Sequence, residues 1–169
     1  MYLLAGDPLS IYLNDHLAGA TVGLELARRT AASNEENVAY GPVLEELEHE
    51  IAQDRTALVD VMARLGVGRD RVKVAAAWAA EKAGRLKPNG RVLSYSPLSR
   101  LEELEVMQLG VNGKLGLWRA LAETRAGDPR LQGVDLRELE ARAQSQWQRL
   151  ERLRLRAAGE ALAPAALEA

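Results

Sequence analysis

The sequence of 169 residues contains no cysteine and no phenylalanine, and it has two histidines. Without cysteine, the chain can form neither a disulfide nor a thiolate metal site. No apolar run approaches the roughly 20 residues that a membrane-spanning helix needs. The first stretch, MYLLAGDPLS, also lacks the features of a signal peptide. We therefore expect a cytoplasmic protein that does not associate with a membrane.

Common catalytic and nucleic-acid-binding signatures are also missing. There is no glycine-rich phosphate loop, no His-Glu-x-x-His motif, no dinucleotide fingerprint and no nucleophile beside a general base. The net charge of −2 gives no overall attraction to nucleic acid. A basic stretch over residues 69–91 contains Trp78 but neither tyrosine nor phenylalanine for stacking on bases. We therefore predict no catalytic residues and no nucleic-acid partner.

The abundant residues favour helices. Alanine, leucine, glutamate and arginine dominate the composition, a bias that is also typical of bacteria with GC-rich genomes. An N-cap or a proline opens each long segment, at Asp7, Pro42, Ser96 and Asp135. The predicted helices cover residues 8–33, 42–65, 70–83, 97–126 and 135–158, and residues 159–169 are expected to form a frayed tail.

The four long segments each carry one apolar stripe, which predicts an all-α four-helix bundle in a single domain over residues 1–158. Short turns join the first two and the last two long helices, so each pair is expected to form an antiparallel hairpin. The residues between the hairpins form a long crossover that includes the short helix over 70–83. One long crossover between two helical hairpins is a known bundle plan.

The order of these helices resembles that of the ferritin-like superfamily, including its small bacterial members of unknown role. The resemblance covers about residues 8–158. Members of that superfamily build a di-iron site from a glutamate on each of two helices and a Glu-x-x-His motif on each of the other two. Glu46 and His49 match one such motif, but the only other histidine is His16, on the first helix. The resemblance therefore implies a bundle whose di-iron site is incomplete.

The helical phase of Glu46 and His49 favours a surface position. At about 100° per residue, both side chains point away from the apolar stripe of their helix. Glu25 lies level with them on the first helix and is also off its stripe. We interpret these three residues as part of a solvated acidic face. The alternative is a metal-binding protein that holds iron, manganese or zinc through His16 or His49 with nearby carboxylates such as Glu25 and Glu46.

Several polar residues lie within the apolar arcs of the helices. His16 lies beside Tyr12 on the first helix, and Asp54 interrupts the apolar stripe of the helix over 42–65. Gln108 and Asn112 are one turn apart near the stripe of the helix over 97–126. Buried polar groups need hydrogen-bond partners. These residues therefore form either core hydrogen bonds or a small ligand-binding pocket.

Gly19 and Gly23 lie on the same side as His16, either to leave room for such a pocket or to let two helices approach closely. We also predict that His16 and Asp54 form an ion pair within the first hairpin. Such a pair would raise the pKa of the histidine and lower that of the aspartate.

The crossover helix has an alanine-rich face, with Val74 and Trp78 on the opposite face. If the alanine face docks on the bundle, Val74 and Trp78 form an exposed partner surface. We therefore expect a homo-oligomer, with a dimer favoured. The sequence as a whole predicts a protein of association or small-ligand binding rather than catalysis, with no cofactor.

Overall fold

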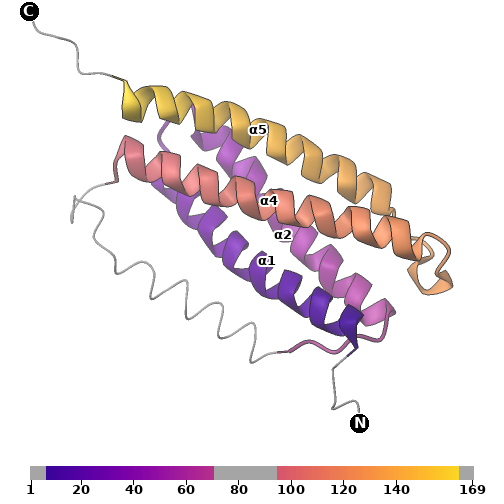
Figure 1. The fold of residues 1–169 in the computed structure, drawn as a ribbon. Helices are drawn as coiled ribbons and strands as arrows, with labels where there is room; N and C mark the ends of the chain where they lie inside the picture. Colours follow the sequence, from indigo (N-terminus) through magenta and orange to yellow (C-terminus); the bar gives the residue numbers. More distant parts are fainter. Residues whose placement is uncertain (1–6, 71–94, 164–169) are drawn as a thin grey trace, which may run out of the picture.

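The computed structural model describes residues 7–70 and 95–163, and all regular structure in these ranges is helical (Figure 1). The long helices are α1 (Pro8–Ser33), α2 (Gly41–Arg64), α4 (Pro97–Arg125) and α5 (Leu136–Leu162), and a short 3-10 helix, η1 (Pro129–Leu131), precedes α5. The prediction of an all-α bundle with four long helices is confirmed. The predicted helix over 70–83, with Val74 and Trp78, lies outside the described residues from position 71 onward.

The helices begin close to the positions that the capping residues and prolines of the sequence predicted. The Asp7 carboxylate accepts a hydrogen bond from the backbone N–H of Ser10 at 3.2 Å, and the Ser96 hydroxyl accepts one from Ser99 at 3.1 Å. Asp135 caps α5 through the N–H of Glu138 at 2.9 Å. These bonds satisfy N–H groups that have no partner inside their helix.

The turn between α1 and α2 requires glycine at its end. A Cβ on Gly41 would lie 2.8 Å from the carbonyl oxygens of Asn34 and Glu35. At the other end of α2, Gly66 has a φ of 73°, a conformation that glycine adopts without strain. The last helix, α5, continues to Leu162, four residues beyond the predicted end at 158. The first residues of the expected frayed tail are therefore helical.

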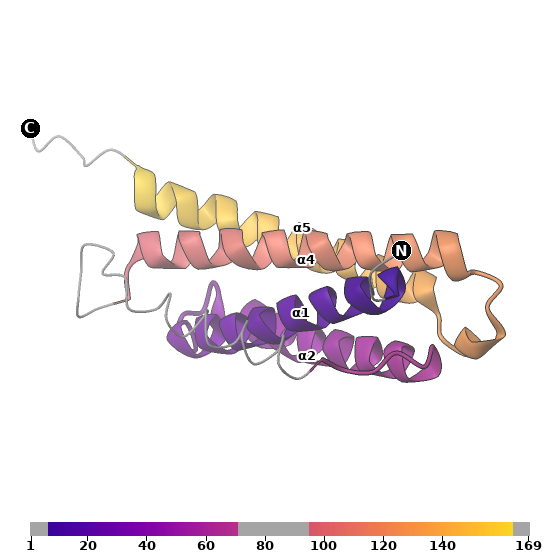
Figure 2. The same ribbon diagram turned by 60° about the horizontal axis from the view of Figure 1, so that its bottom comes forward.

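The four helices pack as two pairs, α1 with α2 and α4 with α5, and α1 also packs against α4. Figure 2 shows the α4–α5 pair lying over the α1–α2 pair. Within the first pair, Arg28 contacts Glu48 and Thr21 contacts Arg55. Residue numbers therefore rise along α1 as they fall along α2. The same holds for α4 and α5, where Gln108 contacts Glu151 and Arg119 contacts Glu140.

The apolar core consists of two clusters along the bundle. One surrounds Trp118 and Met62, and the other surrounds Tyr40 and Leu104. On α2 the change from one cluster to the other falls between Ile51 and Leu58, on α4 between Val111 and Leu115, and on α5 between Ala143 and Leu150. The buried side chains at this intermediate level, Asp54 and Gln146, are polar, and the candidate site lies there.

None of the helices in residues 7–70 and 95–163 combines the length and the apolar character needed to cross a membrane.

Candidate functional site

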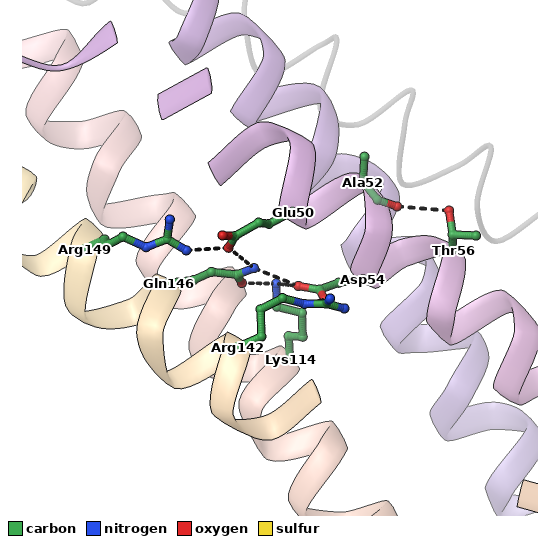
Figure 3. A network of polar contacts seen from close by, with 8 residues as sticks. All are labelled: Glu50, Ala52, Asp54, Thr56, Lys114, Arg142, Gln146 and Arg149. Atoms are coloured by element: carbon green, nitrogen blue, oxygen red, sulfur yellow. Dashed lines mark hydrogen bonds and ion pairs between the residues drawn. The ribbon is translucent and has the colours of Figure 1, made fainter. Parts of the chain in front are cut away.

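A buried carboxylate lies at the centre of the bundle. The Asp54 side chain on α2 is 1% exposed. Its Oδ1 accepts a hydrogen bond from Nε of Arg142 on α5 at 2.7 Å. Its Oδ2 accepts one from Nζ of Lys114 on α4 at 2.5 Å and one from Nε2 of Gln146 at 3.0 Å (Figure 3). Three helices therefore converge on one aspartate.

The network extends from Gln146 toward the surface. This fully buried glutamine accepts a hydrogen bond from Lys114 at 2.5 Å through Oε1, and its Nε2 also donates to Glu50 at 2.9 Å. Glu50 forms an ion pair with Arg149, whose other terminal nitrogen lies 3.1 Å from the exposed Glu46. The chain of contacts runs from Glu46 at the surface to Asp54 in the core.

Charges at this depth need partners because burial removes them from water. Asp54 and Glu50 carry negative charge, and Lys114, Arg142 and Arg149 carry positive charge. Desolvation lowers the pKa of Lys114, and the neighbouring Asp54 carboxylate opposes this by raising it. The ammonium is thus held in an environment that disfavours its charge, and Asp54 compensates for part of this cost.

A pocket of about 500 Å³ adjoins this network between α1, α2 and α4. Its walls are mainly apolar and include Leu26, Ile51, Leu58 and Trp118, and both Asp54 and Lys114 line it as well. The network therefore contributes polar groups to a mainly apolar cavity, which Asp15, His16 and Arg55 also line. Val106 and Leu109 also line the pocket and are 56% and 73% exposed, which places them at its rim.

Four glycines line the pocket, Gly19 and Gly23 on α1 and Gly110 and Gly113 on α4. A Cβ added to any of them would meet no atom within 4 Å. The interpretation that Gly19 and Gly23 permit close helix approach is therefore wrong. The four glycines border open space, and three of them, Gly19, Gly110 and Gly113, are exposed to solvent.

Lys114 and Trp118 each carry an N–H group that has no acceptor among the described residues. The indole N–H of Trp118 is buried and finds no acceptor in the described part of the chain. The ammonium of Lys114 has three N–H groups, and two of them are taken by Asp54 and Gln146. Unsatisfied buried donors are rare in folded proteins and call for an explanation.

The predicted ion pair between His16 and Asp54 is wrong. His16 is half-buried and lines the pocket, where its ring packs edge-to-face on Tyr12 at 4.6 Å between centroids. Asp54 instead bonds to α4 and α5. Desolvation lowers the pKa of His16, although Asp15 opposes this. The predicted direction for the histidine was therefore also wrong, because burial outweighs the nearby negative charge.

The other predicted ligand-binding residues lie elsewhere. Gln108 faces α5, where its amide donates to Glu151 at 2.7 Å, and Asn112 is exposed. Neither residue lines the pocket, and neither does Tyr12. The structure thus brings His16 and Asp54 to one cavity and leaves Gln108 and Asn112 outside it.

The residues proposed for a metal site are on the surface. Glu46 and His49 are exposed, and Glu25 forms an ion pair with Arg28 at 3.1 Å. Among residues 7–70 and 95–163, no three or more histidine, aspartate or glutamate side chains are grouped so that they would hold a metal ion.

Sequence reasoning missed Lys114, Arg142 and Arg149. A usable signal was present, because Lys114 lies three residues after Val111 and four before Trp118, on the stripe of its helix. An aspartate and a lysine that interrupt two apolar stripes are candidates to pair across the core.

Comparisons of this chain with protein families, with curated proteins and with solved structures find no match.

Proposed function

We propose that this protein binds a small apolar molecule in the pocket between α1, α2 and α4 and performs no chemistry on it. The pocket itself is the observation that carries the proposal. Its volume of about 500 Å³ falls within the range of roughly 300–1,000 Å³ that is typical of small-ligand sites. Its composition, apolar walls with a few grouped polar side chains, is also typical of such sites.

The residues around the pocket work against folding, which supports a functional origin. A glycine inside a helix is about 1 kcal/mol less favourable than alanine, and Gly19, Gly23, Gly110 and Gly113 have no steric need to be glycine. The charge of Lys114 is also disfavoured by burial. Places where a sequence departs from what stability favours are often functional.

The charged groups support binding rather than catalysis. Both oxygens of Asp54 accept hydrogen bonds from cationic side chains, so this carboxylate is poorly placed to take a proton from a ligand. Lys114 is held between Asp54 and Gln146. These hydrogen bonds hold Asp54 and Lys114 in position, so neither side chain is a free base at the pocket.

A neutral fluorescent probe, such as N-phenyl-1-naphthylamine, tests the proposal. We expect its emission to rise on titration with the wild-type protein. Gly23→Leu and Gly113→Leu place side chains at the pocket and should reduce the affinity at least tenfold. Gly116→Leu is the matched control, because Gly116 lies on the same helix outside the pocket. No saturable binding to the wild type, or equal binding to all variants, would contradict the proposal.

A second candidate function is self-association through the same face. The exposed Val106 and Leu109 at the pocket rim favour it, because exposed apolar groups often mark contact surfaces. In this case the protein would form a dimer that Leu109→Lys converts to a monomer in sedimentation. A monomeric wild type that binds the probe would leave only the first candidate.

We also propose that the architecture is ferritin-like, with two antiparallel hairpins joined by a crossover. The opposed numbering of the contacts within each helix pair supports this arrangement. A crystal structure that includes residues 71–94 tests it directly.

A further inference from the structure

We infer that the ligand of this pocket is a neutral, apolar molecule with a hydrogen-bond acceptor, such as a ketone or ester carbonyl, which Lys114 binds. This inference rests on the proposed function and adds the chemical class of the ligand. It follows from three properties of the pocket: its unsatisfied donors, its charge balance and the nature of its single lysine.

The polar groups at the pocket offer donors. One N–H of Lys114 remains after Asp54 and Gln146 have accepted the other two. The indole N–H of Trp118, on the same helix, is buried and has no acceptor among the described residues. A ligand that carries an acceptor would satisfy a donor here, whereas a purely apolar ligand would leave it unpaired in an apolar environment.

The charges around the pocket are already balanced. The ionised side chains that line it are two acids, Asp15 and Asp54, and two bases, Arg55 and Lys114, so their sum is zero. An anionic ligand at Lys114 would lie beside the Asp54 carboxylate, 2.5 Å from the same nitrogen, and would be repelled at low effective dielectric, although Arg142, which also binds Asp54, offsets part of this repulsion. A cationic ligand would be repelled by Lys114 itself. The balance therefore favours a neutral ligand.

The use of lysine at position 114 supports the same ligand class. Lys114 is the single lysine in residues 7–70 and 95–163, where every other strongly basic side chain is arginine. A guanidinium is planar and suited to forked binding of carboxylates, whereas an ammonium is compact and directs its three N–H groups to separate acceptors. At this position, two acceptors come from the protein and the third direction is left for a ligand.

Three naphthalenes of nearly equal shape test the inference by calorimetry with the full chain at neutral pH. They are 2-acetylnaphthalene, 2-ethylnaphthalene and 2-naphthoate, which present a neutral acceptor, no acceptor and an anion. We expect the acetyl compound to bind about tenfold more tightly than the ethyl compound, as one hydrogen bond to a charged donor implies. The naphthoate should bind most weakly.

The variant Lys114→Met tests whether Lys114 is the donor that causes the preference for the acetyl compound. In this variant the ratio of acetyl to ethyl affinity should fall to about one, while the ethyl compound still binds. If Lys114→Met does not fold, the relative affinities of the three compounds for the wild-type protein still test the inference. Equal affinity for the acetyl and ethyl compounds, or tightest binding of naphthoate, would overturn the inference and leave the proposed function standing. Failure of all three compounds to bind would refute both.

Discussion

Nζ of Lys114 and Oδ2 of Asp54 lie 2.5 Å apart at the level where the two apolar clusters of the bundle meet. This contact joins α2 of one helix pair to α4 of the other. It also lies beside the pocket, so one pair of residues contributes to both the packing of the bundle and the polarity of the site. Its energetic role is open to direct measurement.

Lys114 and Asp54 should be energetically coupled, so that the effects of removing each partner are not additive. Lys114→Met leaves Asp54 buried with less compensation, and we expect a loss on the order of 3 kcal/mol in the free energy of unfolding. The double variant Lys114→Met with Asp54→Asn removes both charges and should lose less than the sum of the single effects, by at least about 1 kcal/mol. Urea unfolding of the four proteins measures this coupling, and strictly additive losses would show that the pair does not interact.

The positions of the helices were predictable because their signals are local. Asp7, Ser96 and Asp135 each accept a hydrogen bond from the backbone of the next few residues, so their capping function depends on short stretches of sequence. The apolar stripes are likewise periodic within one helix. These features give the number of long helices and their approximate bounds without tertiary information.

The site was predictable only in part because its contacts are distant in sequence. The burial of Asp54 follows from its own stripe, but its partners, Lys114 and Arg142, are separated from it by 60 and 88 residues. Within the first hairpin alone, His16 is the candidate partner of Asp54, and the sequence prediction therefore paired these two residues. Nor does sequence show whether Gly19 borders another helix or open space, since this depends on how far α1 and α4 separate around the pocket.

Helical glycines at the pocket and the turn glycine should respond oppositely to alanine. Gly113→Ala adds a Cβ that meets no neighbour and improves helix propensity, so it should raise the free energy of unfolding by about 0.5–1 kcal/mol. Gly41→Ala places its Cβ 2.8 Å from two backbone oxygens and should lower the free energy of unfolding. Thermal and urea unfolding provide the comparison. A destabilised Gly113→Ala would mean that the pocket is narrower than described.

Glu46 and His49 on α2 should contribute little to the stability of the fold. His49 is exposed and Glu46 is 63% exposed, with a contact to Arg149 at 3.1 Å. Because surface ion pairs are worth about 0–1 kcal/mol, the double variant Glu46→Ala with His49→Ala should change the free energy of unfolding by less than about 1 kcal/mol. Elemental analysis of untagged protein is the companion measurement. Stoichiometric iron, manganese or zinc that disappears in the variant would instead support the metal-binding alternative.

The pH dependence of stability should reflect the burial of His16. Desolvation lowers the pKa of its imidazole below the usual histidine value of about 6.5. At pH values between the folded and unfolded pKa, the unfolded chain therefore binds more protons. Stability should therefore fall as the pH is lowered from about 6.5. His16→Gln should reduce this loss, whereas His49→Gln, at the exposed second histidine, serves as the control. Urea unfolding at pH 5 and pH 8 measures this pH dependence. If His16→Gln instead loses stability chiefly at pH 5, the imidazolium makes a favourable charge interaction in the folded protein.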